Sequence, residues 1–145
     1  MRLEVEAALA PLVGKSLWAW TYAAGMAMFQ IGAKMQYVAR FGPRKGQGRE
    51  VGEYALHVQC RWRLSGPAGR VTDDEREGWV AAGPYGVGSV HADDDGGFLM
   101  VLDREHRLEV SVERGSEYEQ WRLLTPEIEG PARRHFVMTG AGIER

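Results

Sequence analysis

The chain has little cysteine and no long apolar segment. Cys60 is the one cysteine among 145 residues, so no intrachain disulfide forms, as is usual in a reducing cytoplasm. No run approaches the ~18 apolar residues of a membrane-spanning helix. Glu4 and Glu6 lie where a signal peptide has its apolar core. We therefore expect a cytoplasmic protein without a membrane segment.

The chain also has no excess of charge of one sign. Its net charge is −2, which provides no overall attraction to nucleic acid, so a nucleic-acid partner is disfavoured. Hydrophobic residues make up 44% of the chain and charged residues 26%, values that exclude disorder. A chain of 145 residues has the size of one ordinary domain. We expect a single globular domain over residues 1–145.

Residues 53–64 alternate strictly between two kinds of side chain. Glu53, His57, Arg61 and Arg63 belong to the polar series. A period of two over this length predicts a long antiparallel strand with one buried and one wet face. We expect the other series to lie in the core: Tyr54, Leu56, Val58, Cys60, Trp62 and Leu64.

The remaining pattern predicts one helix followed by short strands. A helix is expected over about residues 3–13, with Pro11 and Gly14 at its end. Residues 98–102 and 107–113 predict a hairpin that turns at 103–106, and further strands are expected at 17–22, 26–31, 119–124 and 135–139. The predicted class is α+β, mostly β. It is an antiparallel meander of strands from about residue 16 to 140, forming a sandwich or open barrel with one N-terminal helix.

Charge is distributed unevenly along the chain. Residues 33–70 carry eight Lys or Arg against two acids, a net +6, and residues 71–119 carry four against thirteen, a net −9. Neighbouring strands of opposite sign would pair across a sheet, whereas two separate charged faces would attract a charged partner. For the second case, the candidate partner-binding residues are Arg44, Lys45, Arg49, Asp73, Asp74, Asp93, Asp94 and Asp95.

No catalytic or metal-binding motif is present. The four histidines are widely spaced, and Asp93, Asp94 and Asp95 beside His91 lack the order of a calcium-binding loop. This cluster is better explained as a solvated turn, and we expect no metal and no cofactor. Cys60, placed on the apolar face of its strand, is expected to be a buried thiol and not an activated nucleophile.

A polar row on the long strand provides the alternative hypothesis. If the strand curls into a barrel, Glu53, His57 and Arg61 line an interior site, while a flat strand presents them to solvent. His135 would join this site. Alternating aromatic residues would form its apolar wall or, in the simpler case, part of the core: Trp18, Trp20 and Tyr22.

Several segments resemble a known family. Residues 53–64 (EYALHVQCRWRL), with Phe29–Gly32 before them and residues 121–123 and 135–140 after them, resemble a family of short uncharacterised bacterial proteins. The chain departs from that family at Arg61, where proline is frequent, and the family implies no activity. The strand-rich plan is also similar to immunity-protein-like families, which bind and neutralise a toxin.

Two functions follow as hypotheses. The first is a non-catalytic binding protein that engages a protein partner or a second copy of itself, in the manner of an immunity protein. The alternative is a small-molecule-binding β-barrel, or a small enzyme, with its site around Glu53, His57 and Arg61.

Overall fold

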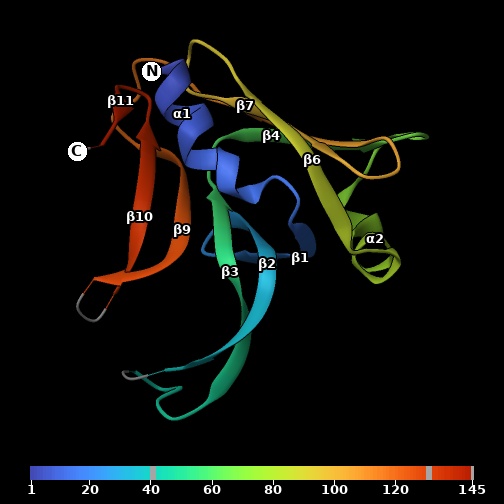
Figure 1. The fold of residues 1–145 in the computed structure, drawn as a ribbon, viewed down its shortest axis with the longest axis vertical. Helices are drawn as coiled ribbons and strands as arrows, with labels where there is room; N and C mark the ends of the chain where they lie inside the picture. The colour runs from blue at the N-terminus through green and yellow to red at the C-terminus, as the bar shows by residue number, and fades with distance from the viewer. Residues whose placement is uncertain (40–41, 130–131, 145) are drawn as a thin grey trace.

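The computed structural model describes residues 1–39, 42–129 and 132–144, most of them in β-strands (Figure 1). The helical elements are α1 (Arg2–Leu9), η1 (Ala10–Leu12, 3₁₀), η2 (Asp73–Glu75, 3₁₀) and α2 (Arg76–Ala82). The strands are β1 (Ser16–Ala23), β2 (Met26–Val38), β3 (Gly48–Val58), β4 (Arg61–Gly66), β5 (Gly69–Arg70), β6 (Tyr85–Ala92), β7 (Phe98–Leu102), β8 (His106–Ser111), β9 (Glu119–Glu129), β10 (Ala132–Thr139) and β11 (Gly142–Ile143). The predicted mostly-β class with an N-terminal helix is confirmed.

All of these strands belong to one open antiparallel sheet. Its order is β11-β10-β9-β3-β2-β1-β6-β7-β8-β4-β5. Hairpins join most neighbours, but the pairs β1–β6, β3–β9 and β4–β8 unite strands that are distant in sequence. Strand β3 continues into β4 through only Gln59 and Cys60, although five strands separate the two in the sheet order. The sheet must therefore curl around its core to bring them end to end.

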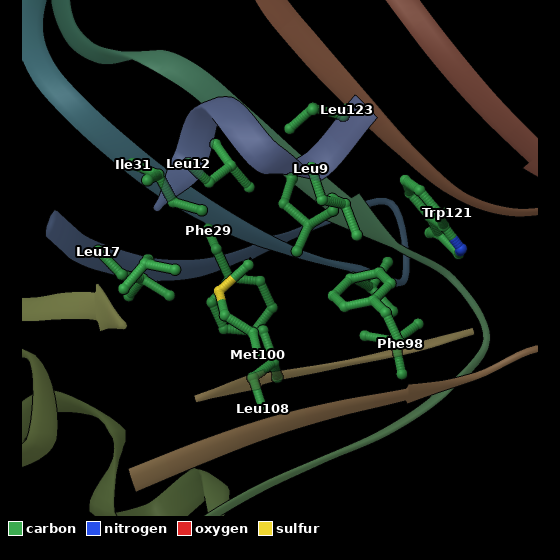
Figure 2. Packing of buried hydrophobic residues seen from close by; sticks show 14 of the residues in the cluster. Leu9, Leu12, Leu17, Phe29, Ile31, Phe98, Met100, Leu108, Trp121 and Leu123 are labelled. Atoms are coloured by element: carbon green, nitrogen blue, oxygen red, sulfur yellow. The ribbon is translucent and has the colours of Figure 1, made fainter. Parts of the chain in front are cut away.

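The helix α1 covers the concave side of this curled sheet. Its Val5 and Leu9, and Leu12 of η1, are fully buried. They are spaced four and three residues apart, so all three lie on one face of the helical segment. Figure 2 shows Leu9 and Leu12 pointing from the helix into the same layer as Phe29 and Phe98. The helix thus closes a core to which both halves of the sheet contribute.

The long predicted strand is interrupted where the sheet bends. The backbone N–H groups of Gln59 and Cys60 both donate to the carbonyl of Gln120, at 2.9 and 3.1 Å. The alternation nevertheless survives the bend, because Leu64 is buried while Arg61 and Arg63 are exposed. Trp62 and Cys60, which we expected to lie in the core, are only partly enclosed by it. Both are half-buried and pack against the edge of the core.

A β-bulge in β1 changes which of the aromatic side chains of this strand face the core. The register with β2 shifts between Leu17 and Ala19, so Leu17 and Trp20 both face the core although they are three residues apart. Trp18 therefore lies on the other face of the sheet, outside the core, and Tyr22 is 44% exposed. Only Trp20 of the three predicted aromatics is a core residue.

The second helix, α2, was not predicted. It follows a capping box in which the Thr72 backbone N–H donates to the Glu75 carboxylate at 3.0 Å. The helix buries Trp79, whose ring stacks on Tyr85 of β6 with ring centroids 4.0 Å apart. This contact ties α2 to the start of β6.

The β2–β3 hairpin extends beyond the rest of the fold. Its outer part, residues 33–39 and 42–52, is called the arm below. Figure 1 shows the arm projecting along the long axis, with both chain ends toward the opposite end of the molecule. Residues 40–41 and 130–131 lie outside the described residues. Arg40, counted in the charge of residues 33–70, is one of them.

Candidate functional site

The arm carries several large apolar side chains that are exposed. The exposed fractions of Met35, Tyr37 and Val38 are 39%, 44% and 54%. Met35 pairs with Val51 and Tyr37 with Arg49 across the hairpin, so these four side chains share one face. Large exposed apolar side chains gathered on one element are typical of an interaction surface.

The same arm is basic. Arg44, Lys45 and Arg49, three of the predicted partner-binding residues, lie on it together with Lys34, against one acid, Glu50. The Arg49 guanidinium lies over the Tyr37 ring, 5.3 Å from its centroid. Lys34 lies 4.9 Å from the centroid of Trp18 and 4.0 Å from the Glu50 carboxylate. Basic and aromatic groups are thus held side by side along the arm.

A polar cluster around Glu53 fixes the root of the arm. Gly32 adopts a φ of +89°, and a Cβ there would lie 2.4 Å from Cγ of Glu53. The Glu53 carboxylate accepts a hydrogen bond from the Ala33 N–H at 3.0 Å and contacts the Lys15 ammonium at 2.8 Å. The bond to Lys15 lowers the pKa of Glu53 and raises that of Lys15. Glycine at position 32 allows this carboxylate to bind the backbone of the arm.

Two further side chains hold the arm root to the sheet. The Trp18 indole N–H donates to the carbonyl of Gly32 at 3.0 Å, and the Gly52 N–H donates to the side-chain oxygen of Gln30 at 2.8 Å. These bonds replace the ladder where the β2–β3 register shifts. The arm therefore leaves the sheet in a defined direction.

Arg133 of β10 spans the fork between the arm and the β9–β10 hairpin. Its guanidinium donates to the carbonyl of Glu53 and, at 2.8 Å, to the carbonyl of Thr125. Burial lowers the pKa of this guanidinium. It supplies hydrogen-bond donors where β3 and β9 stop pairing with each other. The Arg133 side chain thus takes the place of the backbone hydrogen bonds between these two strands.

His57 and His135 lie on the outer face of the sheet, in a patch with Glu119 and Arg122. The neighbours Leu56 and Val58 face the core, which directs His57 to the other side. Arg122 donates to Glu119 and to Nδ1 of His135. An imidazole nitrogen that accepts from a guanidinium is unprotonated. Burial is the main cause that lowers the pKa of both His57 and His135, with Arg122 next.

Arg61 and Cys60 line a polar groove. The groove has a volume of about 630 Å³ and also includes Gln59, Tyr118 and Gln120. Burial raises the pKa of the Cys60 thiol to about 11, so the thiol stays protonated at neutral pH. The groove thus presents hydrogen-bonding groups and no activated nucleophile at Cys60.

The acidic candidates lie on the body of the protein and not on the arm. Asp73 belongs to η2, next to Asp74, and Asp93, Asp94 and Asp95 form the turn between β6 and β7. The Asp93 carboxylate accepts from the backbone N–H of Asp95 and of Gly97, as in the predicted solvated turn. Ion pairs link Asp94 to Arg2 at 2.8 Å and Asp95 to Arg114 at 3.3 Å.

The structure therefore divides the predicted site residues among several places. Glu53 and Trp18 lie at the arm root, His57 and His135 on the outer patch, Arg61 in the groove, and Trp20 and Tyr22 near α2. Because the interior is filled by apolar side chains, Glu53, His57 and Arg61 do not share an enclosed pocket. The sequence argument overlooked Met35, Tyr37, Lys15, Arg122 and Arg133. The alternation of residues 34–38 was the available signal for the first two.

In the part of the chain that the structure describes, no helix has the length and apolarity needed to cross a membrane. Among the same residues, no three His, Cys, Asp or Glu side chains gather in an arrangement that could hold a metal ion.

Comparison of the chain with protein-family models, curated proteins and solved structures finds no match. The resemblances to a short bacterial family and to immunity-type proteins stay predictions.

Proposed function

We propose that this protein acts by binding, and that it engages a partner protein with an acidic surface through the arm. The observation that carries the proposal is the combination of Met35, Tyr37 and Val38, all exposed, with four described basic residues on one projecting hairpin. An isolated two-stranded ribbon is only marginally stable in water. Here the arm root supplies the anchoring contacts, and a partner would supply the cover for the apolar face.

The composition of the arm supports a protein over a nucleic acid as the partner. The described arm holds Lys34, Arg44, Lys45 and Arg49 against Glu50, a net charge of +3, which is modest for phosphate recognition. Apolar and aromatic side chains with arginine are enriched in the centres of protein interfaces. Basic residues around them accelerate association with an acidic partner. A toxin bound by an immunity protein is one partner of this kind.

Affinity capture with matched bait variants tests the proposal. The baits are the wild-type chain, the arm variant Met35→Ser/Tyr37→Ser, and the control Tyr118→Ser, whose side chain is 81% exposed elsewhere on the surface. A specific partner protein should be retained by the wild type and by the control. It should be lost from the arm variant and weakened by added salt, because rim charges are screened.

Three results would count against this function. Equal retention by the arm variant would place binding elsewhere. Loss of the captured material after nuclease treatment would identify a nucleic acid as the ligand. A dimer of the purified wild-type chain in analytical ultracentrifugation, lost in the arm variant, would show that the arm binds a second copy of the chain.

A further inference from the structure

The arm has an open edge along strand β3. Strand β3 pairs with β9 only from Ala55 to Val58, and within the described part of the chain its outer half has no neighbouring strand on that side. On its other side, β3 pairs with β2 along the arm. Figure 1 shows the β2–β3 and β9–β10 hairpins diverging beyond the β3–β9 pairing. The outer half of β3 is therefore a sheet edge that faces the fork.

The hydrogen bonds at the arm root show which backbone groups point toward this edge. The Glu53 carbonyl faces the fork, where it accepts from Arg133. The Gly52 N–H points the other way, toward β2, where it donates to a side chain at 2.8 Å. Backbone groups of successive residues alternate between the two edges of an antiparallel strand. The N–H and C=O of Arg49 and Val51 therefore face the fork.

These four backbone groups lack a partner strand. Among the described residues, no ladder or turn hydrogen bond reaches Arg49 or Val51 from the fork side. A strand edge with unpaired backbone groups is a template for the addition of another strand. Backbone groups of an extended segment satisfy such an edge, as in peptide recognition by strand addition. The geometry of the edge thus specifies the conformation of what binds it.

The charge of the arm favours an acidic segment over a second copy of this chain. The described arm has a net charge of +3, so two arms placed edge to edge would repel each other. Arg49 lies on the edge itself and forms no ion pair within the described ranges. Side chains directly opposite each other in a ladder interact. An acidic residue opposite Arg49 and an apolar residue opposite Val51 would complement this edge.

We propose that the arm recognises its partner by strand addition, in which an extended acidic segment of the partner pairs with β3 over residues 48–52. This inference rests on the proposed function, because it specifies how the arm binds an acidic partner. Arg133 occupies the edge at the arm root and confines the added strand to the outer half of β3. Met35 and Tyr37 share a face with Val51, so apolar side chains of the segment would extend that face.

A synthetic peptide tests strand addition in the absence of a natural partner. The probe is acetyl-Thr-Val-Thr-Glu-Thr-Glu-amide, whose antiparallel register places valine opposite Val51 and the first glutamate opposite Arg49. We expect saturable binding to the full chain with a dissociation constant of about 1 mM, as suits a short flexible peptide.

Amide hydrogen exchange of the ¹⁵N-labelled chain locates the added strand. The N–H groups of Met35 and Tyr37 lie opposite Val51 and Arg49 and face the other open edge of the arm, so they are internal controls. A peptide concentration of about ten times the dissociation constant should slow exchange at Arg49 and Val51 by about tenfold, because about nine tenths of the protein is then bound. Exchange at Met35 and Tyr37 should not change.

Matched variants separate backbone pairing from charge. N-methylation of the peptide at valine and at the first glutamate removes the two donors directed at β3 and retains every side chain. It should weaken binding at least about tenfold. Val51→Pro removes one donor from the protein edge, where proline is tolerated, and should weaken binding about fivefold. Val51→Ala retains that donor and should weaken binding less than about twofold.

Three results would overturn strand addition at β3. They are an absence of saturable binding, equal binding of the N-methylated peptide, and protection of Met35 and Tyr37 in place of Arg49 and Val51. In each case, a partner captured by the wild-type chain and lost from Met35→Ser/Tyr37→Ser would leave the proposed function intact. Protection of Arg49 and Val51 without any captured partner would support recognition of acidic strands and count against the proposed function.

Discussion

The helix α1 provides a paired test of how the core is closed. Leu9 and Leu3 belong to the same short helix, but Leu9 is fully buried while Leu3 is 79% exposed. Leu9 points into the layer of side chains between the two halves of the sheet (Figure 2). Leu9→Ala therefore removes buried methyl groups and leaves a cavity against residues from several strands, whereas Leu3→Ala removes the same atoms from water.

The expected magnitudes differ clearly. A fully buried leucine in a core costs about 3–5 kcal/mol when it is truncated to alanine, and an exposed one changes stability by less than about 0.5 kcal/mol. Urea unfolding followed by tryptophan fluorescence measures both. With a slope of about 2 kcal/mol per molar urea, the midpoint of Leu9→Ala should fall by about 1.5–2.5 M.

Equal and small effects of the two leucine variants would refute the packing of α1 against the sheet. The core would then be closed by the strands alone, and the helix would be an appendage. An equal and large effect of both would instead show that the buried face of the helix is rotated from the one described.

Other measurements test the strand bend, the outer patch and the thiol. Trp62→Ala should destabilise the protein by about 2 kcal/mol, less than the loss of a fully buried tryptophan side chain. Arg61→Ala should change the free energy of unfolding by no more than about 0.5 kcal/mol in the same urea assay. The reverse order of the two effects would mean that the faces of β4 are exchanged. Because burial lowers the pKa of His57 and His135 below 6.5, the unfolded chain binds more protons as the pH falls through 6.5, and the free energy of unfolding should decrease there. The double variant His57→Gln/His135→Gln should flatten that decrease in unfolding curves recorded between pH 7 and pH 5, and an unchanged slope would exclude both imidazoles as its source. With a thiol pKa of about 11, Cys60 should react with a disulfide reagent at pH 7 more slowly than a free cysteine does, and faster reaction would contradict the burial of its sulfur.

Periodicity in the sequence was sufficient to predict most strands, but it could not predict which strands lie next to each other in the sheet. Alternation along residues 53–64 correctly assigned the sides of Leu56, Leu64, Arg61 and Arg63, since a side chain's face depends on local geometry. The bend at Gln59 could not be predicted from that alternation, because the alternation of core-facing and outward-facing side chains continues in the same phase on both sides of it. The pairing of β3 with β9 and of β4 with β8 depends on contacts across the whole chain.

Local irregularities account for the other differences. A single extra residue in β1 moved Trp18 away from Trp20, and no sequence period announces such a bulge. The helix α2 was missed although Thr72 and Glu75 have the spacing of a capping box, because a helix of only seven residues leaves little helical periodicity in the sequence. The grouping of the polar residues could not be predicted, because it depends on Lys15, Arg122 and Arg133, whose long side chains reach other strands.

The placement of the arm and the chain ends at opposite ends of the molecule has a practical consequence for the design of binding assays. Figure 1 places both ends toward one end of the long axis and the arm at the other. A fluorescent protein, a biotin acceptor peptide or a surface linker attached at either end would therefore be held away from Met35 and Tyr37. The chain can be immobilised in a known orientation on a biosensor chip, with the arm facing the flow. Fusions at the two ends should then report the same partner affinity.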